Sequence, residues 1–172
     1  MRAITVVVTG LSVVAGVGLA AGLVLWRPAV AGDAFAHANT THGYSVESSS
    51  GANRIVASPE NNTDYRDAFI GRGGDMSLTF EFMEADGSPE QCAPEQYIAR
   101  NETPQTFRTG VDTTGHWVWT QGSDNYRLVK TILRSDGCLK MQMDYAAREV
   151  ETWNAIGFQL IESFSDRSRR RP

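Results

Sequence analysis

Residues 138–164 have the sequence CLKMQMDYAAREVETWNAIGFQLIESF, and this stretch decides the fold because its apolar period changes partway along. Over 138–145 apolar and polar residues alternate, which predicts a strand with one buried face. Over 146–164 the apolar residues recur every three or four positions, which predicts an amphipathic helix. We therefore expect a strand that runs into a long closing helix, with the apolar stripe of that helix packed on the sheet.

Upstream of this stretch, further strands are predicted from alternation and from the turn residues between them. The clearest is 76–83, where apolar residues alternate with Ser77, Thr79 and Glu81. Ser88 and Pro89 suit a helix start, and Pro94 leaves a short helix over 94–100. Short turns join successive strands as antiparallel hairpins, so the predicted class is α+β: a curved antiparallel sheet with a short mid-chain helix and a long C-terminal amphipathic helix packed on it. The remaining predicted strands are 43–47, 53–58, 67–71, 105–111, 116–121 and 125–134.

The N-terminal 31 residues have the character of a membrane leader. Residues 3–26 carry no charge and are flanked by Arg2 and Arg27. Ala29-Val30-Ala31 matches the cleavage site of a secretory signal peptide, whereas the length of the apolar run suits a transmembrane anchor. We expect the rest of the chain on the exported side, periplasmic or extracellular. One Arg on each side of the run does not set the orientation of an anchor, and both interpretations stay open here.

Composition divides the remainder into three parts. Residues 32–42 are small and polar and predict a linker, 43–165 a single α+β domain, and 166–172 a basic disordered tail. Past the leader, 14 Lys and Arg (16 less Arg2 and Arg27) face 20 Asp and Glu, a net charge of −6. Such an acidic body is poor material for contacting phosphates, so we expect no nucleic-acid partner.

Two cysteines, Cys92 and Cys138, are present. An even count in an exported chain favours a disulfide, and the alternative is a pair of buried free thiols. Because Cys92 lies in the predicted mid-chain helical region and Cys138 opens a strand, the bridge would pin that region to the sheet. We predict no metal site, since the two cysteines have no histidine nearby in sequence.

No catalytic or cofactor motif is found in the chain, so neither an enzyme nor a cofactor is predicted. His37 and His42 fall in the predicted linker, where solvated side chains are expected. His116 opens a predicted strand and is interpreted as a strand-end residue. A set of aromatic residues is a better candidate for a functional site, because Trp117 and Trp119 share one face of that strand.

These two tryptophans, with Tyr126 across the hairpin, have two interpretations. They are core beneath the closing helix, or they line a groove that binds a ligand. The ligand interpretation makes Trp117, Trp119 and Tyr126 the candidate binding residues.

Three segments resemble the PsbP-like fold group, which includes a photosystem-associated extrinsic protein, bacterial lipoproteins and a Ran-binding relative. They are Gly43-Tyr44-Ser45-Val46, then 76–80 followed by a Ser-Pro-Glu helix start, and Trp153 with 161–164 after Met143-Asp144-Tyr145. The resemblance covers about residues 42–165. Ser48–Gly51 stands where members of the group commonly have a proline. The resemblance implies an exported, non-catalytic binding or assembly domain and transfers no site residues.

Two function hypotheses follow. The first is an exported or membrane-tethered interaction or assembly domain whose partner is a protein at the membrane or envelope. The second is a domain that binds a small apolar ligand in a cavity between the sheet and the closing helix. A filled core beneath the helix would favour the first.

Overall fold

The computed structural model describes residues 33–168, apart from 52, 59–61, 85–88 and 99–105. The leader, including the predicted signal or anchor over 1–31, lies outside the described residues. Within them, no helix is long and apolar enough to cross a bilayer.

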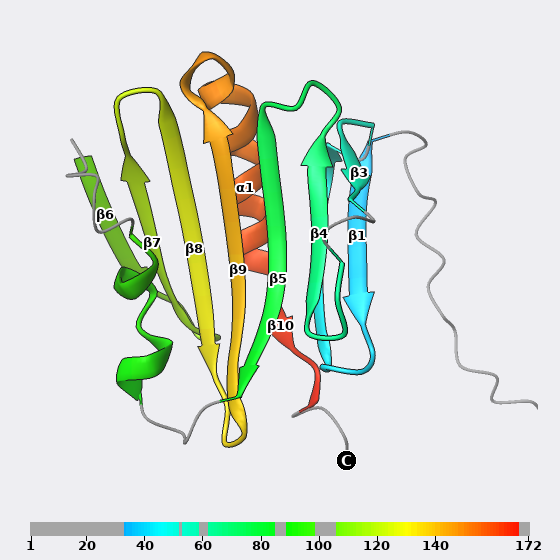
Figure 1. The fold of residues 1–172 in the computed structure, drawn as a ribbon, viewed down its shortest axis with the longest axis vertical. Coiled ribbons are helices and arrows are strands. Elements are labelled where there is room, and N and C mark those ends of the chain that lie inside the picture. The colour runs from blue at the N-terminus through cyan, green and yellow to red at the C-terminus, as the bar shows by residue number, and fades with distance from the viewer. Residues whose placement is uncertain (1–32, 52, 59–61, 85–88, 99–105, 169–172) are drawn as a thin grey trace, which may run out of the picture.

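The centre of the molecule is a seven-stranded antiparallel sheet (Figure 1). Its order is β3-β4-β5-β9-β8-β7-β6, so β5 and β9 lie at the middle and β3 and β6 at the edges. The strands predicted at 76–83 and 138–145 become β5 and β9, whose paired residues include Leu78 opposite Met143 and Phe80 opposite Met141. The bounds are β3 Ile55–Ala57, β4 Arg66–Gly71, β5 Met76–Glu84, β6 Thr106–Val111, β7 His116–Gln121, β8 Asn125–Leu133 and β9 Gly137–Ala146.

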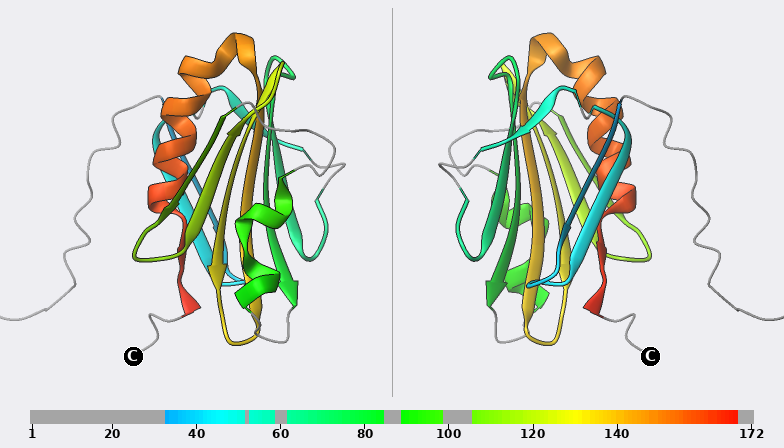
Figure 2. Two further views of the ribbon diagram at one scale, coloured as in Figure 1. Left: turned by 90° about the vertical axis from the view of Figure 1, so that its left-hand side faces the viewer. Right: turned by 90° about the vertical axis from the view of Figure 1, so that its right-hand side faces the viewer.

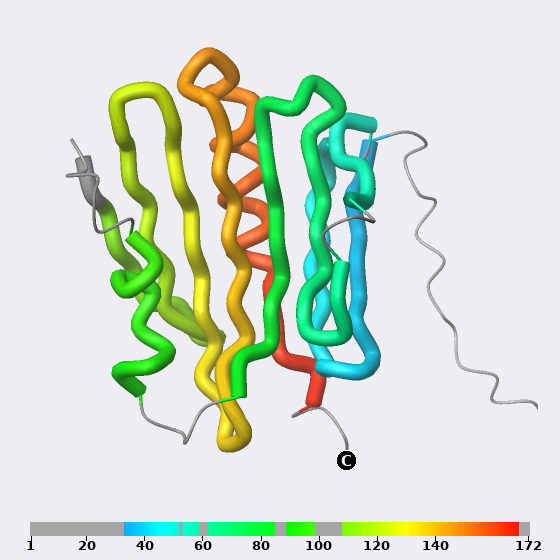
Figure 3. Tube along the Cα trace, viewed as in Figure 1, coloured from blue at the N-terminus to red at the C-terminus, as the bar shows by residue number. Residues whose placement is uncertain are grey.

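A second, three-stranded sheet contains β1 (Ala34–Asn39), β2 (Tyr44–Gly51) and β10 (Ser165–Asp166). Figure 3 shows β10, in red, next to the hairpin of β1 and β2, in blue and cyan. The predicted linker at 32–42 is therefore wrong, because its small residues hide an alternation that buries Phe35. The predicted disordered tail is wrong at its start too. Asp166 belongs to β10, and the backbone N–H of Arg167 donates to the carbonyl of Gly43 at 2.6 Å.

The closing helix α1 covers Val150–Ser163, after a 3₁₀ turn, η4, at Ala147–Glu149. It begins later than the predicted residue 146 because Ala146 still pairs with Asn125 in the sheet. The two views in Figure 2 show α1 and the small sheet on one face of the main sheet. The core fills the space between them, and the side chains with at most 3% exposure there include Leu78, Phe80, Leu128, Met141, Met143, Trp153, Leu160 and Phe164.

The opposite face carries two 3₁₀ helices of four residues, η2 (Pro89–Cys92) and η3 (Pro94–Tyr97). The short mid-chain helix predicted over 94–100 is thus 3₁₀ at 94–97, and residues 99 and 100 lie outside the described residues. Pro94 lacks an N–H, and Ala93 before it is extended (φ −67°, ψ 121°), so a continuous helix is interrupted there. The domain is thus α+β with three layers: α1 and the small sheet, the main sheet, and the 3₁₀ turns.

Candidate functional site

The predicted aromatic set lies on the α1 face of the sheet. Trp119 is 7% exposed and belongs to the core cluster. Its indole N–H is shared between the Tyr145 hydroxyl (3.0 Å) and the Asn154 amide oxygen (3.2 Å). Tyr126 stacks on Tyr145 with ring centroids 5.6 Å apart and planes 9° from parallel. Trp119 is therefore held from the sheet and from α1, as a packed core residue is.

Trp117 occupies the outer part of the same face. Its indole lies over Gly110 of β6, where any Cβ would collide with the ring. It also meets Phe158 of α1 edge-on at 5.9 Å. Trp117 and Tyr126 are partly buried against the core cluster. The structure thus brings all three predicted residues together as part of the packing beneath α1, and their role in ligand binding stays a prediction.

A polar cluster joins the two sheets around Asp67 of β4. One carboxylate oxygen, Oδ2, accepts hydrogen bonds from His37 (2.9 Å), Asn39 (2.8 Å) and the Tyr44 hydroxyl. The prediction that His37 is solvated is wrong, because its ring is turned inward between Asp67 and the ring of Phe69.

Burial and hydrogen bonding shift the pKa values of Asp67 and Tyr44 in this cluster. Partial burial by itself would raise the pKa of Asp67, but the hydrogen bonds from Asn39, Tyr44 and His37 outweigh it and hold that pKa below its usual range. Burial and the neighbouring carboxylate raise the pKa of Tyr44, so the phenol remains a donor at all ordinary pH values. The cluster therefore fastens the small sheet to the main sheet.

His42, the other predicted linker histidine, also makes specific contacts. Its ring stacks on Phe82 (centroids 5.1 Å apart, planes 16° from parallel), and its Nε2 lies 2.6 Å from the carbonyl of Asp64. Beside it is a polar hollow of about 440 Å³ that Arg134 and Arg167 help to line. The charge of Arg134 is met by both carboxylate oxygens of Asp136 at 2.9 Å, whereas the guanidinium of Arg167 donates to the hydroxyl of Ser45 at 2.7 Å.

Lys130 is fully buried, a feature that the sequence did not reveal. Its ammonium donates to Asp112 (2.8 Å), Thr114 (2.6 Å) and the carbonyl of Ile161 near the end of α1 (2.7 Å). Burial lowers the pKa of Lys130 despite the nearby carboxylate of Asp112. With three acceptors and the negative end of a helix dipole around it, this lysine ties α1 to the turn after β6 and is not available for chemistry.

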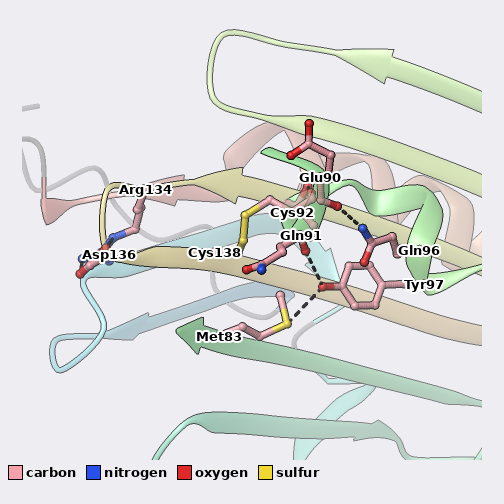
Figure 4. Close-up of a disulfide and its surroundings, with 10 residues drawn as sticks. Met83, Glu90, Gln91, Cys92, Gln96, Tyr97, Arg134, Asp136 and Cys138 are labelled. Carbon is pink, nitrogen blue, oxygen red and sulfur yellow. Dashed lines mark hydrogen bonds and ion pairs between the residues drawn. A yellow bond between two sulfur atoms is a disulfide. The ribbon is translucent and has the colours of Figure 1, made fainter. Parts of the chain in front are cut away.

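Cys92 and Cys138 form a disulfide with their Cα atoms 5.8 Å apart. Figure 4 shows that the bridge joins η2 to β9, close to Met83 and Tyr97. The hydroxyl of Thr131 in β8 also donates to the carbonyl of Cys92 at 2.5 Å. The bridge therefore pins the mid-chain 3₁₀ turns to the sheet, as the positions of the two cysteines predict.

Next to the bridge is a hollow of about 450 Å³ that we call the disulfide hollow. Apolar groups dominate its wall, and two of them are well exposed: Val111 (72%) and Leu133 (37%). His116 stands on its wall as an exposed strand-end residue. Residues from η2, the turn after β6, and β8 meet here, which is why no single stretch of sequence indicated it. The hollow is lined by Pro89, Glu90, Cys92, Ala93, Val111, Asp112, Thr114, Gly115, His116, Thr131 and Leu133.

Within the described residues, no three His, Cys, Asp or Glu side chains are grouped so that they could hold a metal ion. The hollows described above lie on the outside of the sheets rather than beneath α1.

Comparison with known proteins agrees with this architecture. The chain is similar to the solution structure of cyanobacterial PsbP from Synechocystis sp. PCC 6803, with a TM-score of 0.52 over 91% of this chain and 98% of that one. Sequence identity is 10%, so the likeness establishes a PsbP-like fold and nothing further. No family model matches the sequence, and no curated protein matches it.

Proposed function

We propose that this chain is an exported or membrane-tethered interaction domain that assembles with a protein partner at the membrane or envelope and carries out no catalysis. The observation that carries the proposal is the disulfide hollow, where Val111 and Leu133 expose apolar surface beside a covalently fixed wall. Exposed apolar surface gathered around one concavity is typical of protein contact sites.

Four further features support it. The space beneath α1 is occupied by side chains that are almost fully buried, as expected for a domain that works through its surface. The ammonium of Lys130 is saturated by three structural hydrogen bonds, and Nε2 of His37 is held by Asp67. The PsbP-like fold group that the chain resembles includes a photosystem-associated extrinsic protein. The disulfide suits an oxidising compartment outside the cytoplasm.

The test is a substitution pair on the full chain expressed in its own membrane. Val111→Lys places a charge at the hollow, and Ile70→Lys places the same charge at a 40% exposed position of β4 on the same face of the sheet. We expect Val111→Lys to reduce recovery of a membrane partner in quantitative co-purification at least fivefold, while Ile70→Lys leaves it unchanged. Equal recovery with both variants would contradict an interaction through the hollow.

Export has its own test. Thiol titration of the unfolded, unreduced protein from cells should find no free cysteine. Two titratable thiols would show that the chain matures in a reducing compartment.

A further inference from the structure

We infer that β6 is a strand-addition site: the partner contributes an extended segment that pairs with the free edge of β6 and places an apolar side chain in the disulfide hollow. This inference rests on the proposed function, since it names how the partner binds. Among the described residues, β6 pairs only with β7 and ends the sheet. In the left-hand view of Figure 2, β6 is on the side of the sheet nearest the viewer.

The backbone pattern shows which groups of β6 are free. The Asp112 N–H donates to the carbonyl of Gly115 at 3.0 Å, so these two residues form a hydrogen-bonded pair. Such pairs alternate along an antiparallel ladder, and the register from Thr106 to Val111 has no bulge. The N–H and C=O groups of 107, 109 and 111 therefore point away from β7, which gives an incoming strand three donors and three acceptors.

Protection against unwanted pairing is weak at this edge. Natural edge strands are usually short, or carry a proline, a bulge or an inward-pointing charge. β3, at the opposite edge, is three residues long, whereas β6 has six residues and no proline. The one protective feature of β6 is Arg108, an inward-pointing charge whose guanidinium lies 5.3 Å from the centroid of the Trp119 ring on the α1 face. On the opposite face, beside the disulfide hollow, Thr109 and Val111 are uncharged.

Side-chain direction links this edge to the hollow. Val111 pairs with His116, and both line the disulfide hollow. Directly opposed residues of neighbouring strands share a face, so a residue added opposite Val111 points its side chain toward the hollow. An aliphatic side chain there would cover Val111 and Leu133 together.

Charge specifies the partner further. Glu90 is exposed on the wall of the hollow and forms no ion pair with any described residue, whereas Asp112 is committed to Lys130. The body of the chain has a net charge of −6, from 14 basic and 20 acidic residues. The segment that fits is therefore an extended one with an aliphatic residue next to a Lys or Arg.

The experiment places a photo-crosslinking amino acid at His116, and in a separate protein at Tyr65, which is 57% exposed and does not line the hollow. The full chain is irradiated in its own membrane, and the crosslinked residue of the partner is mapped by mass spectrometry. A synthetic peptide of the mapped segment is then titrated against the purified protein. We expect a crosslink from 116 into an aliphatic and basic segment, and slowed amide exchange at Thr109 and Val111 when the peptide binds.

Two variants sharpen the test. Thr109→Pro removes an outward N–H without breaking the ladder to β7, and we expect it to weaken peptide binding roughly tenfold. Glu90→Gln should weaken it about two- to fivefold and reduce its salt dependence. Ile70→Lys is the matched control and should change neither. Circular dichroism and thermal melting establish that Thr109→Pro remains folded, and Glu90→Gln tests the same site without altering the backbone.

Other outcomes would overturn the inference. Capture from Tyr65 but not from 116 would keep the proposed function and remove this surface. Capture from neither position would remove the proposed function itself. A crosslink from 116 only to a second copy of the chain, with dimers in light scattering, would mean that β6 pairs with itself. Peptide binding that leaves exchange at Thr109 unchanged would show that the hollow is used without strand addition.

Discussion

Different interactions attach the neighbouring layers to the two faces of the main sheet. Against α1 and the small sheet, the contact is continuous and apolar, with Trp153 1% and Phe164 0% exposed. Against the 3₁₀ turns, the sheet presents charged residues in pairs, including Lys140 with Glu81 (2.6 Å) and Arg127 with Asp144 (2.5 Å), together with one covalent bridge. Burial stabilises the first face over a wide area, whereas a few separate links hold the second. We therefore expect a substitution on the first face to destabilise the whole domain, and a substitution on the second face to affect only its surroundings.

Trp153→Ala should be the most damaging change, because it empties a fully enclosed site on the α1 face. We expect the free energy of unfolding to fall by about 3–5 kcal/mol, measured by urea denaturation. Ile70→Ala, on the other face and 40% exposed, should change it by less than about 1 kcal/mol. A loss under about 1 kcal/mol for Trp153→Ala would mean that α1 contributes little to the domain.

Removing the bridge with Cys92→Ser and Cys138→Ser should cost about 2–4 kcal/mol. The bridge closes a sequence separation of 46 residues, for which chain entropy sets an upper figure of about 4 kcal/mol. Amide exchange should speed up in η2 and η3 and remain slow in α1. Faster exchange in both would show that the two faces are not independent.

The chain has only two lysines, and they make a matched pair for the next comparison. Lys130→Met removes a fully buried ammonium and takes one donor from the Ile161 carbonyl and one from Oδ2 of Asp112, so we expect a loss of about 2–3 kcal/mol. Lys140→Met removes a 9% exposed side chain whose partner, Glu81, is 23% exposed, and about 1 kcal/mol is expected. Thermal denaturation of both variants at pH 7 measures the difference. Equal losses would mean that the link to α1 adds nothing.

Acid should weaken the domain through Asp112. Partial burial opposes ionisation, but hydrogen bonds from Lys130, Thr114 and Gly115 lower the pKa of Asp112 to about 2. Because the folded pKa lies below the ordinary value of about 3.9, the stabilisation is complete above about pH 4 and is lost as pH falls toward 2. We expect a loss of about 1–2 kcal/mol over that window in urea melts. Asp112→Asn should flatten it, and an unchanged slope would contradict this role.

The sequence predicted those elements whose apolar residues repeat at a regular interval along the chain. β5 and β9 agree with prediction to within one residue at each end, because a strand with one buried face repeats every two residues. The Cys92–Cys138 disulfide agrees with the prediction made from the even number of cysteines in an exported chain. The packing of α1 on the sheet agrees with the prediction made from its apolar stripe.

Prediction failed where burial depends on distant partners. Ala34, Ala36, Ala38 and Asn39 suggest a linker by composition, yet β1 forms because Asp67, about 30 residues away, accepts hydrogen bonds from His37 and Asn39. The alternation of β8 places Lys130 on the inner face. The neighbouring sequence gives no sign that Asp112 and the carbonyl of Ile161 accept hydrogen bonds from its ammonium. The disulfide hollow likewise exists only once three separated segments have met.

The small sheet joins the two ends of the described chain, and this has a consequence for biogenesis. β2 is held by β10 and, through Gln159 of α1, by hydrogen bonds to Ser48 and Ser49 across 110 residues or more. A chain that emerges N-terminus first from a ribosome or a translocation channel has its first hairpin outside long before these partners arrive. Such long-range closure delays folding until the last segment is free. The small sheet can therefore close only after α1 and β10 have been made, and we expect a product that stops short of β10 to be cleaved by proteases more readily than the full chain.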